Sequence, residues 1–560
     1  MSIIRTLLIC VLTLSSVMAL SAETISQQVI ATSAEPKKAT DSFQSSVNKF
    51  PSASYVEKQQ LIDIIRASKN ERALELFNGI LSGDIFYVKK TNEVVYRAPT
   101  EDRKFLVTSF SSGKEVGLFK KRKLKKIGIN NSLRGNLKNA IAELQLFSAI
   151  LEDRELAALS ILKTASSDHQ TLINSALKFE QSNGEDEYII EVLTTSKSLI
   201  DLKSEDPVVR LQAIKYLDKS LYVETRNGLS GFIDHALINF DDYNQAEITL
   251  AKTTLDDINQ LMKINAVIEN IYFGVALGAV LLLAAIGLAI TFGVMGVINM
   301  AHGEMIMLGA YTTFVIQQLM PNHIGLSLVV AVPAAFLVSG TVGVLVERSV
   351  IRHLYGRPLE TLLATFGVSL ILQQAVRSIF GPLNQDVVTP DWMAGTFTVN
   401  AGLELTFNRL YIIIFSLMVL VGLALVLKKT LFGLQMRAVT MNRPMASSMG
   451  IKTGWVDALT FGLGSGIAGI AGVALSQLTN VGPNLGQAYI IDSFMVVVFG
   501  GVGNLWGTLV GAMSLGIANK IMEPMAGAVL AKIIVLVAII LFIQKRPRGL
   551  FALKGRAVEG

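Results

Sequence analysis

The feature that most constrains this chain is a series of long uncharged stretches, all of which lie after residue 270. The first, Ile271 to Ile298, contains 28 residues and no Asp, Glu, Lys or Arg. At a rise of about 1.5 Å per residue, a helix of this length crosses a hydrocarbon layer of roughly 30 Å. Most of the charge lies before residue 270. The sequence therefore predicts two halves, the first in water and the second in a membrane.

The composition also favours a membrane protein. Of the 560 residues, 51% are apolar and only 17% are charged, which is low for a soluble protein. The formal net charge is +6, and the basic residues of the second half cluster at the ends of the uncharged stretches. We attribute the positive charge to the sidedness of a membrane protein and expect no nucleic-acid partner.

Residues 1 to 22 predict a signal peptide for export. Arg5 supplies the positive charge, Leu7 to Met18 form the apolar core, and cleavage is expected after Ala19 or Ala22. The alternative is an uncleaved anchor helix. The only cysteine, Cys10, lies in this segment, so the mature chain is expected to have no disulfide and no thiolate metal site.

Residues 23 to 268 predict a mostly helical domain outside the cytoplasm. Apolar residues recur every three or four positions in Leu137 to Leu151, Leu156 to Ile161 and Val208 to Leu217. The segment Ser204 to Leu217 starts with a helix cap and an early proline, and it resembles one unit of a HEAT-type repeat. We therefore expect a stack of helices.

Other features of this domain suggest contact with a partner, and none predicts catalysis. Asp84 to Val88 and Glu93 to Arg97 predict a small β-hairpin. The basic run Lys120 to Lys126 suits anionic lipid or an acidic partner, or is simply a solvated edge. His169 and His235 each neighbour an aspartate, but no third group joins them by spacing. We interpret this half as an interaction domain.

Residues 269 to 545 predict a membrane bundle of eight or nine helical crossings, so the fold class predicted for the whole chain is all-α. Pro321-Asn-His323 divides one long uncharged stretch into two crossings. The predicted spans are Ile271 to Ile298, two within Met305 to Val346, Thr361 to Val376, Leu410 to Leu427, Ala458 to Leu478, Ser493 to Asn519 and Val529 to Gln544.

The basic residues predict the orientation of the bundle, because short loops rich in Lys and Arg stay in the cytoplasm. The loop from Gly381 to Asn408 carries acidic residues and is expected outside, and the tail from 546 to 560 inside. Ser493 to Asn519 must then supply two short crossings or none, and is expected to be a broken element. The basic clusters are Arg348, Arg352 and Arg357; Lys428, Lys429, Arg437, Arg443 and Lys452; and Lys545, Arg546, Arg548, Lys554 and Arg556.

Polar residues within the spans are candidates for a translocation pathway, because buried charge in hydrocarbon is costly. Glu347 adjoins Arg348 and is interpreted as interfacial. His302 and Glu304 lie two residues apart, so they are expected to point in different directions on a helix. Either of them can bind solute or satisfy the backbone of a broken helix. The pathway candidates are Asn299, His302, Glu304, Gln373, Gln374, Asn484, Asp492 and Asn504.

Three motifs in order resemble the permease of the branched-chain amino-acid class of bacterial ABC importers. They are Gly296-Val-Ile-Asn-Met-Ala-His-Gly-Glu304, Gly433-Leu-Gln-Met-Arg-Ala438 and Phe499-Gly-Gly-Val-Gly-Asn504. Within that class, Val481-Gly-Pro-Asn-Leu-Gly-Gln-Ala-Tyr489 resembles the urea permeases more than the amino-acid ones. The motifs Phe292 to Gly296 and Phe499 to Gly503 also share a pattern that suggests an internal repeat.

The resemblance implies a complex in the bacterial inner membrane. Its other parts are a second related permease subunit, two cytoplasmic ATPase subunits and a periplasmic solute-binding protein. The chain has no GxxxxGK[ST] phosphate loop, so it is expected to be no enzyme and to bind no cofactor, with ATP used by the partner subunits.

The resemblance also implies an ATPase-coupling loop between Gly433 and Ile451. A short helix is expected to begin at Asn442, with Pro444 in its first turn. The residues assigned to coupling are Arg437, Ala438, Asn442, Ala446, Gly450 and Ile451.

The expected solute is urea, because neutral amides and hydroxyls can replace its hydration without a counter-ion. Branched-chain amino acids or short amides are the alternative solutes. A second alternative is an exported helical binding module held by a membrane anchor, and an autonomous channel is a third.

Overall fold

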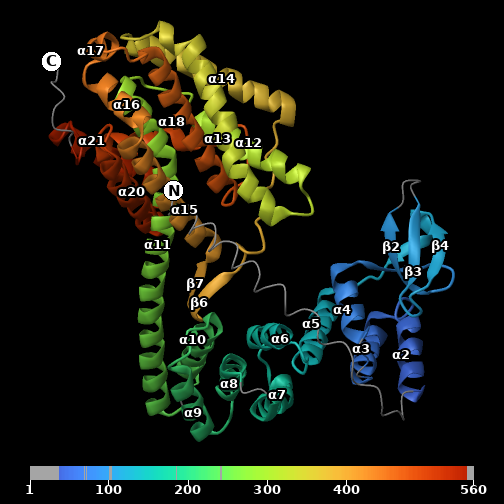
Figure 1. Cartoon of the computed structure of the whole chain (residues 1–560). Coiled ribbons are helices and arrows are strands. Elements are labelled where there is room, and N and C mark those ends of the chain that lie inside the picture. The colour runs from blue at the N-terminus through green and yellow to red at the C-terminus, as the bar shows by residue number, and fades with distance from the viewer. Residues whose placement is uncertain are drawn as a thin grey trace. The chain divides into compact units, whose positions relative to one another are not determined.

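The computed structural model describes residues 37–68, 70, 72–99, 104–183, 186–239 and 242–551. They form two compact units, divided between Ala213 and Ile214, and each is described by itself (Figure 1). The predicted signal peptide with Cys10, and the basic residues Lys554 and Arg556, lie outside the described residues.

The first unit contains an antiparallel sheet of five strands in the order β4-β3-β2-β1-β5. The predicted hairpin is confirmed as β1 and β2, with Phe86 opposite Val95. The prediction of an all-α chain is wrong here, because this unit contains a five-stranded sheet. Three of its strands were not predicted, since they are too short for an alternating pattern to be recognised. The strands are β1 (Ile85–Val88), β2 (Val94–Pro99), β3 (Phe105–Ser109), β4 (Glu115–Phe119) and β5 (Leu124–Lys126).

Helices make up the rest of this unit. Phe50, Ile65, Phe77 and Leu137 are fully buried between α2 to α5 and the sheet. The helix predicted at Val208 to Leu217 is confirmed as α9, whereas HEAT-type stacking stays a prediction. The helices are α2 (Lys37–Lys49), α3 (Tyr55–Ala67), α4 (Arg72–Ser82), α5 (Asn131–Gln145), α6 (Leu151–Lys163), α7 (Gln170–Asn183), α8 (Glu187–Asp201), α9 (Pro207–Leu217) and the 3-10 turns η1 (Lys121–Lys123) and η2 (Ser167–His169).

The basic run and the two histidines have structural surroundings. In Lys120 to Lys126 only Leu124 is buried, and the lysines lie exposed on the edge strand β5 and the turn before it. This arrangement fits a solvated basic edge, which also discourages pairing with other strands. His169 Nδ1 lies 3.4 Å from a serine hydroxyl, and His235 Nδ1 lies 3.0 Å from a tyrosine hydroxyl. Among the described residues, no group of three His, Cys, Asp or Glu could hold a metal ion.

The second unit is organised around α11 (Gln245–Met295), a single helix of 51 residues that follows α10 (Val223–Ile238). The domain boundary predicted between residues 268 and 269 falls inside α11. The chain offers nothing there to end a helix: α11 contains no proline, and its first glycine is Gly274. The polar part of α11 therefore continues directly into the apolar part.

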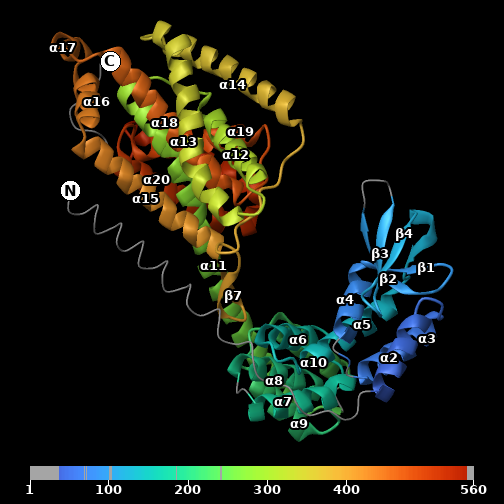
Figure 2. The same cartoon turned by 45° about the vertical axis from the view of Figure 1, so that its right-hand side comes forward.

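The bundle surrounds the apolar part of α11 (Figures 1 and 2). Six described helices are long and apolar enough to span a membrane: α11, α13, α14, α15, α18 and α21, with α11 and α18 the most buried. The predicted count of eight or nine crossings stays a prediction. The bundle comprises α11, α12 (His302–Leu319), α13 (Ile324–Ser349), α14 (Pro358–Phe380), α15 (Phe407–Lys429), α18 (Thr453–Ser476), α19 (Leu485–Gly500), α20 (Leu505–Ala526) and α21 (Ala528–Lys545), with η4 (Ile351–His353) between α13 and α14.

The predicted broken element at Ser493 to Asn519 forms two helices, α19 and α20, joined by a short turn. The two glycine motifs proposed as a repeat end α11 and α19. They also meet, since a Cβ on Gly293 would lie 2.5 Å from the Gly503 Cα. The similarity of the motifs thus accompanies a contact between them.

Opposite ends of the bundle carry different connections. At one end, the hairpin of β6 (Thr396–Asn400) and β7 (Leu403–Thr406) is held against α11, where the Tyr272 hydroxyl donates to the Thr406 carbonyl at 2.7 Å. At the other end lie α16 (Leu431–Met441) and α17 (Arg443–Ser448) (Figures 1 and 2). We call these the hairpin end and the α17 end.

Small residues allow the central helices to approach closely. A Cβ on Gly309 of α12 would collide with the Gly469 carbonyl of α18, and one on Gly472 would collide with the Ile306 carbonyl and approach Ala310 N. Without a hydrophobic driving force between helices in lipid, such close backbone packing is a main source of association. The bundle therefore depends on the absence of side chains at these crossings.

We predict that Gly472→Ala lowers the stability of the protein by about 1–3 kcal/mol, because the added methyl meets backbone atoms that cannot move away cheaply. The matched control is Gly422→Ala on α15, where the space is open and a helical alanine is expected to be neutral or slightly stabilising. Thermal unfolding of the purified chain in detergent measures both. Equal melting temperatures for the two variants would contradict this packing.

Candidate functional site: a buried polar cluster and the α17 end

The helix break lies between α11 and α12. α11 ends at Met295 and is capped by Gly296, whose φ of +68° is left-handed and whose N–H donates to the Phe292 carbonyl at 3.0 Å. Residues 297 to 301 are not helical, and α12 begins at His302. Such a break is tolerated at membrane depth only where its backbone groups find partners.

Polar side chains supply those partners. The Asn299 side-chain oxygen accepts from the Ala301 N–H at 3.0 Å, and the Thr365 hydroxyl of α14 accepts from the Met300 N–H at 3.1 Å. Asn299 and Ala301 are fully buried. Asn299, a pathway candidate, thus satisfies a backbone group of the helix break through its side-chain oxygen.

His302 and Glu304 diverge, as their spacing predicts. His302 Nε2 lies 2.8 Å from the Ala284 carbonyl of α11, and because a carbonyl only accepts, this nitrogen carries the proton. Glu304 Oε1 instead faces α14, where it accepts from the Ser369 hydroxyl at 2.9 Å and the Gln373 amide at 2.8 Å. His302 thus ties α12 to α11, and Glu304 ties it to α14.

α14 carries a buried polar stripe that the sequence analysis recognised only at Gln373. Thr361, Thr365, Ser369 and Gln373 follow one another at four-residue spacing, and all four are buried. On a helix this spacing places them on one face, so the stripe was readable from the sequence. Gln374, by contrast, is exposed and does not join the cluster.

The remaining pathway candidates lie elsewhere. Asn484 accepts from Arg377 at 2.6 Å, and Asp492 pairs with Lys532 of α21 at 3.3 Å. Asn504 caps α20, since its side-chain oxygen accepts from the N–H groups of the two residues that follow Leu505. Asn299, His302 and Glu304 are therefore buried at the helix break, where Gln373 contacts Glu304 and His302 faces α11. We call these four residues the polar cluster.

Three buried polar atoms of the cluster have no protein partner among the described residues: Asn299 Nδ2, His302 Nδ1 and Glu304 Oε2. They comprise one donor, one ring nitrogen that can accept, and one carboxylate acceptor. Buried polar groups are usually satisfied, so these atoms are the ones that water or a solute would contact.

The short helix predicted at Asn442 is confirmed as α17. The Asn442 side chain accepts from the Met445 N–H at 3.0 Å, and Pro444 lies in the first turn. The helix ends at Ser448. Gly450, two residues further on, has a φ of +86°, and the Ile451 N–H donates back to the Ala446 carbonyl at 3.1 Å. This is the Schellman arrangement, in which glycine takes the left-handed position.

Charged side chains attach α17 to the bundle, and one of them, Asp457, was not predicted from the sequence. Arg443 pairs with Asp457 of α18, which is fully buried, and its guanidinium lies 4.5 Å from the Tyr355 ring centre. Glu347 is paired with its neighbour Arg348 at 3.7 Å near the end of α13 and is only 1% exposed, and its interfacial position stays a prediction. It also accepts from the Tyr355 hydroxyl at 3.3 Å.

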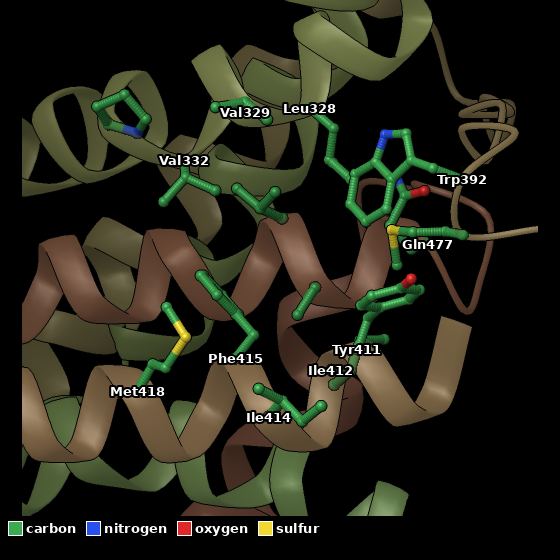
Figure 3. Close-up of a pocket in the computed structure, with 14 residues that line it drawn as sticks. Leu328, Val329, Val332, Trp392, Tyr411, Ile412, Ile414, Phe415, Met418 and Gln477 are labelled. Carbon is green, nitrogen blue, oxygen red and sulfur yellow. The ribbon is translucent and has the colours of Figure 1, made fainter. Parts of the chain in front are cut away.

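A separate pocket of about 440 Å³ lies between α13, α15 and α18 (Figure 3). Figure 3 shows Trp392, Tyr411 and Gln477 at one end of it and Met418 toward the other. Its remaining lining is almost entirely aliphatic or aromatic. It offers too few hydrogen-bonding groups to replace the hydration of a small polar solute.

We predict that Gln373→Leu destabilises the protein by about 1–2 kcal/mol, because it leaves the buried Glu304 with one donor fewer. The matched control is Gln374→Leu, the same substitution at the next residue of α14, where the side chain is exposed. It should change the stability by less than about 0.5 kcal/mol. Unfolding of both purified variants is compared with that of the unaltered chain. Equal losses at the two positions would mean that the Glu304 contact contributes nothing.

Comparison with known proteins assigns the second unit to a family. Residues 270–543 match the family "branched-chain amino acid transport system / permease component". The permease protein LivH of the Escherichia coli high-affinity branched-chain amino acid transport system is 30% identical over 293 residues, 94% of its length and 50% of this chain. BraD of Pseudomonas aeruginosa, a permease protein of the same kind, is 28% identical over 95% of its length and 50% of this chain.

A third relative, the probable branched-chain amino acid transport permease protein LivH of Methanocaldococcus jannaschii, is 27% identical over 76% of its length and 43% of this chain. No solved structure matches the chain. The range that matches the family, residues 270–543, includes the helix break, the α17 loop and the glycine turn. The chain belongs to the family of permease components of branched-chain amino acid transport systems.

Proposed function

We propose that the chain is the membrane permease subunit of an ATP-driven importer in the bacterial inner membrane, and that its solute is urea. The observation that carries the first part is α17, a short helix capped at both ends and fixed to α18 by the Arg443–Asp457 pair. A rigid element of this kind can transmit a movement of the loop to the membrane-spanning helices.

The exposed side of the α17 loop fits contact with an ATPase subunit. Met441, Met445 and Met449 follow one another at four-residue spacing and are 77%, 62% and 76% exposed. Methionine is common at surfaces that bind other proteins. Since the chain contains no phosphate loop of its own, two cytoplasmic ATP-binding subunits, a second permease subunit and a periplasmic solute-binding protein complete the proposed complex.

The basic residues support the orientation. The Arg348 cluster, Lys428 and Lys452 border the α17 end, and Asp386 and Glu404 belong to the connection at the hairpin end. The α17 end is then cytoplasmic, together with the C-terminal tail. The first unit, a HEAT-like domain in this proposal, is periplasmic and contacts a partner.

Two features of the chain support urea as the solute. The segment Val481 to Tyr489 resembles the urea permeases. The unpartnered atoms at the helix break are a donor on Asn299 and an acceptor on Glu304, which complement the carbonyl and N–H groups of urea. A zwitterionic amino acid would require two compensating charges, and Asp492 and Arg377 are already engaged by other side chains.

Branched-chain amino acids are the second candidate, because the relatives are permeases of transport systems for them. Uptake of radiolabelled urea and of radiolabelled leucine, in cells with and without this chain and lacking other routes for each, separates the two. Loss of urea uptake alone supports the proposal. If only leucine uptake is lost, the solute is assigned to the branched-chain amino acids. If neither uptake is lost, both solutes are excluded.

We predict that Met445→Glu combined with Met449→Glu lowers co-purification of the ATPase subunits at least tenfold, because charge is placed in an apolar contact. The matched control is Met525→Glu at the hairpin end of α20, where the methionine is 87% exposed. Pull-down of the tagged chain from membranes measures the effect. An unchanged yield of ATPase in the double variant would exclude α17 as its docking element, and a membrane-anchored binding module would then be favoured.

A further inference from the structure

A groove that is separate from the pocket of Figure 3 lies at the α17 end, between α11, α15, α16 and α20. It has a volume of about 720 Å³, and its walls are apolar side chains such as Ile290, Leu420 and Ala424. On α15 it extends from Leu420 to Lys429, which is about 14 Å at 1.5 Å per residue. This is close to half the roughly 30 Å of a hydrocarbon layer, so the groove belongs to one leaflet.

All the charge of the groove is positive and lies at one end. Lys428, Lys429 and Arg437 line the groove where α15 passes into α16, and the three side chains are exposed. Neither lysine has an ion-pair partner in the described part of the chain. One guanidinium N–H of Arg437 donates to the Leu427 carbonyl, which holds this side chain at the groove.

Other features of this end also favour an anion. The first turn of α20 reaches the groove through Asn504, Leu505 and Trp506, and the N-terminus of a helix carries partial positive charge. The described residues that line the groove include no Asp or Glu. Trp506 is 63% exposed, as is common for indoles at the level of lipid headgroups.

The open side of the groove faces the surface of the bundle. Val421 and Leu425, which line it, are 57% and 54% exposed although they belong to a helix long and apolar enough to span the membrane. An occupant therefore enters from the bilayer. Its body must be apolar over one leaflet, and its head must be anionic at the level of the lysines.

We propose that this groove binds one anionic glycerophospholipid, with an acyl chain along α15 and the phosphate at Lys428, Lys429 and Arg437. Basic pockets between helices on the cytoplasmic side of a membrane are suited to such headgroups. The lipid would bridge α15 and α16, and so link a span to the α17 loop. This inference does not depend on the identity of the solute.

The test uses the full chain in nanodiscs of mixed phosphatidylethanolamine and phosphatidylglycerol, followed by native mass spectrometry of the lipids it retains. The unaltered protein should retain phosphatidylglycerol in excess of its share of the bilayer. Lys428→Gln with Lys429→Gln should reduce that excess on the order of tenfold. The matched control is Lys545→Gln with Arg546→Gln, a basic pair at the end of α21 that does not line the groove, and it should retain the excess.

A second pair of variants tests the apolar part. Ala424→Phe fills the groove and should remove retained lipid of either headgroup, whereas Val426→Phe, on the same helix but outside the groove, should not. The proposal is overturned if the unaltered chain shows no preference between the two lipids, or if both basic pairs lower the preference equally. Retention of lipid by Ala424→Phe, or of a polypeptide in place of lipid, overturns it as well.

Discussion

Every backbone N–H and C=O in a hydrocarbon layer needs a partner, and this requirement determines how the bundle is built. The chain interrupts its longest helix at Gly296, which frees several of these groups. Asn299 and Thr365 satisfy two of them, and His302 and Glu304 attach the following helix to its neighbours. The polar motif thus satisfies backbone groups at the helix break and attaches α12 to its neighbours, and it leaves three buried polar atoms without a partner in the described part of the chain.

Close backbone contact gives the bundle its rigidity. Gly309, Gly469 and Gly472 let α12 and α18 approach so closely that backbone carbonyls lie where a side chain would otherwise be. Gly293 and Gly503 likewise lie close to each other. Interfaces of this kind shift as units because they cannot deform gradually. α18 belongs to this packing and also holds Arg443 through Asp457. α17 is therefore connected through α18 to the helices that surround the polar cluster.

Local signals predicted many elements well. Asn442, Pro444 and Gly450 specify both ends of α17 through capping alone, and the divergence of His302 and Glu304 follows from helical geometry. The hairpin at β1 and β2 was found because its strands are apolar and its turn polar. The family was recognised from three motifs that follow one another along the chain, and all three lie within the residues that match the family. These features depend on residues near one another in the chain.

The features that were not predicted depend on distant contacts or on weak patterns. β3, β4 and β5 have three to five residues each, which is too few for alternation to exceed chance. The boundary predicted between residues 268 and 269 followed the change in polarity, whereas α11 continues through it because no proline or glycine interrupts residues 245 to 273. The Arg443–Asp457 pair joins residues that no periodicity relates. The stripe on α14 was detectable at four-residue spacing, but Gln374 beside Gln373 obscured it.

The proposed function requires that the α17 end lies in the cytoplasm. The most direct measurement is labelling of intact cells by a membrane-impermeant maleimide, with a cysteine placed at Ser448 in a chain whose Cys10 is replaced. A cysteine at Asp386, near the hairpin end, serves as the partner position. We expect label at position 386 in intact cells and at position 448 only after permeabilisation. Label at position 448 in intact cells would contradict the orientation and with it the role of α17.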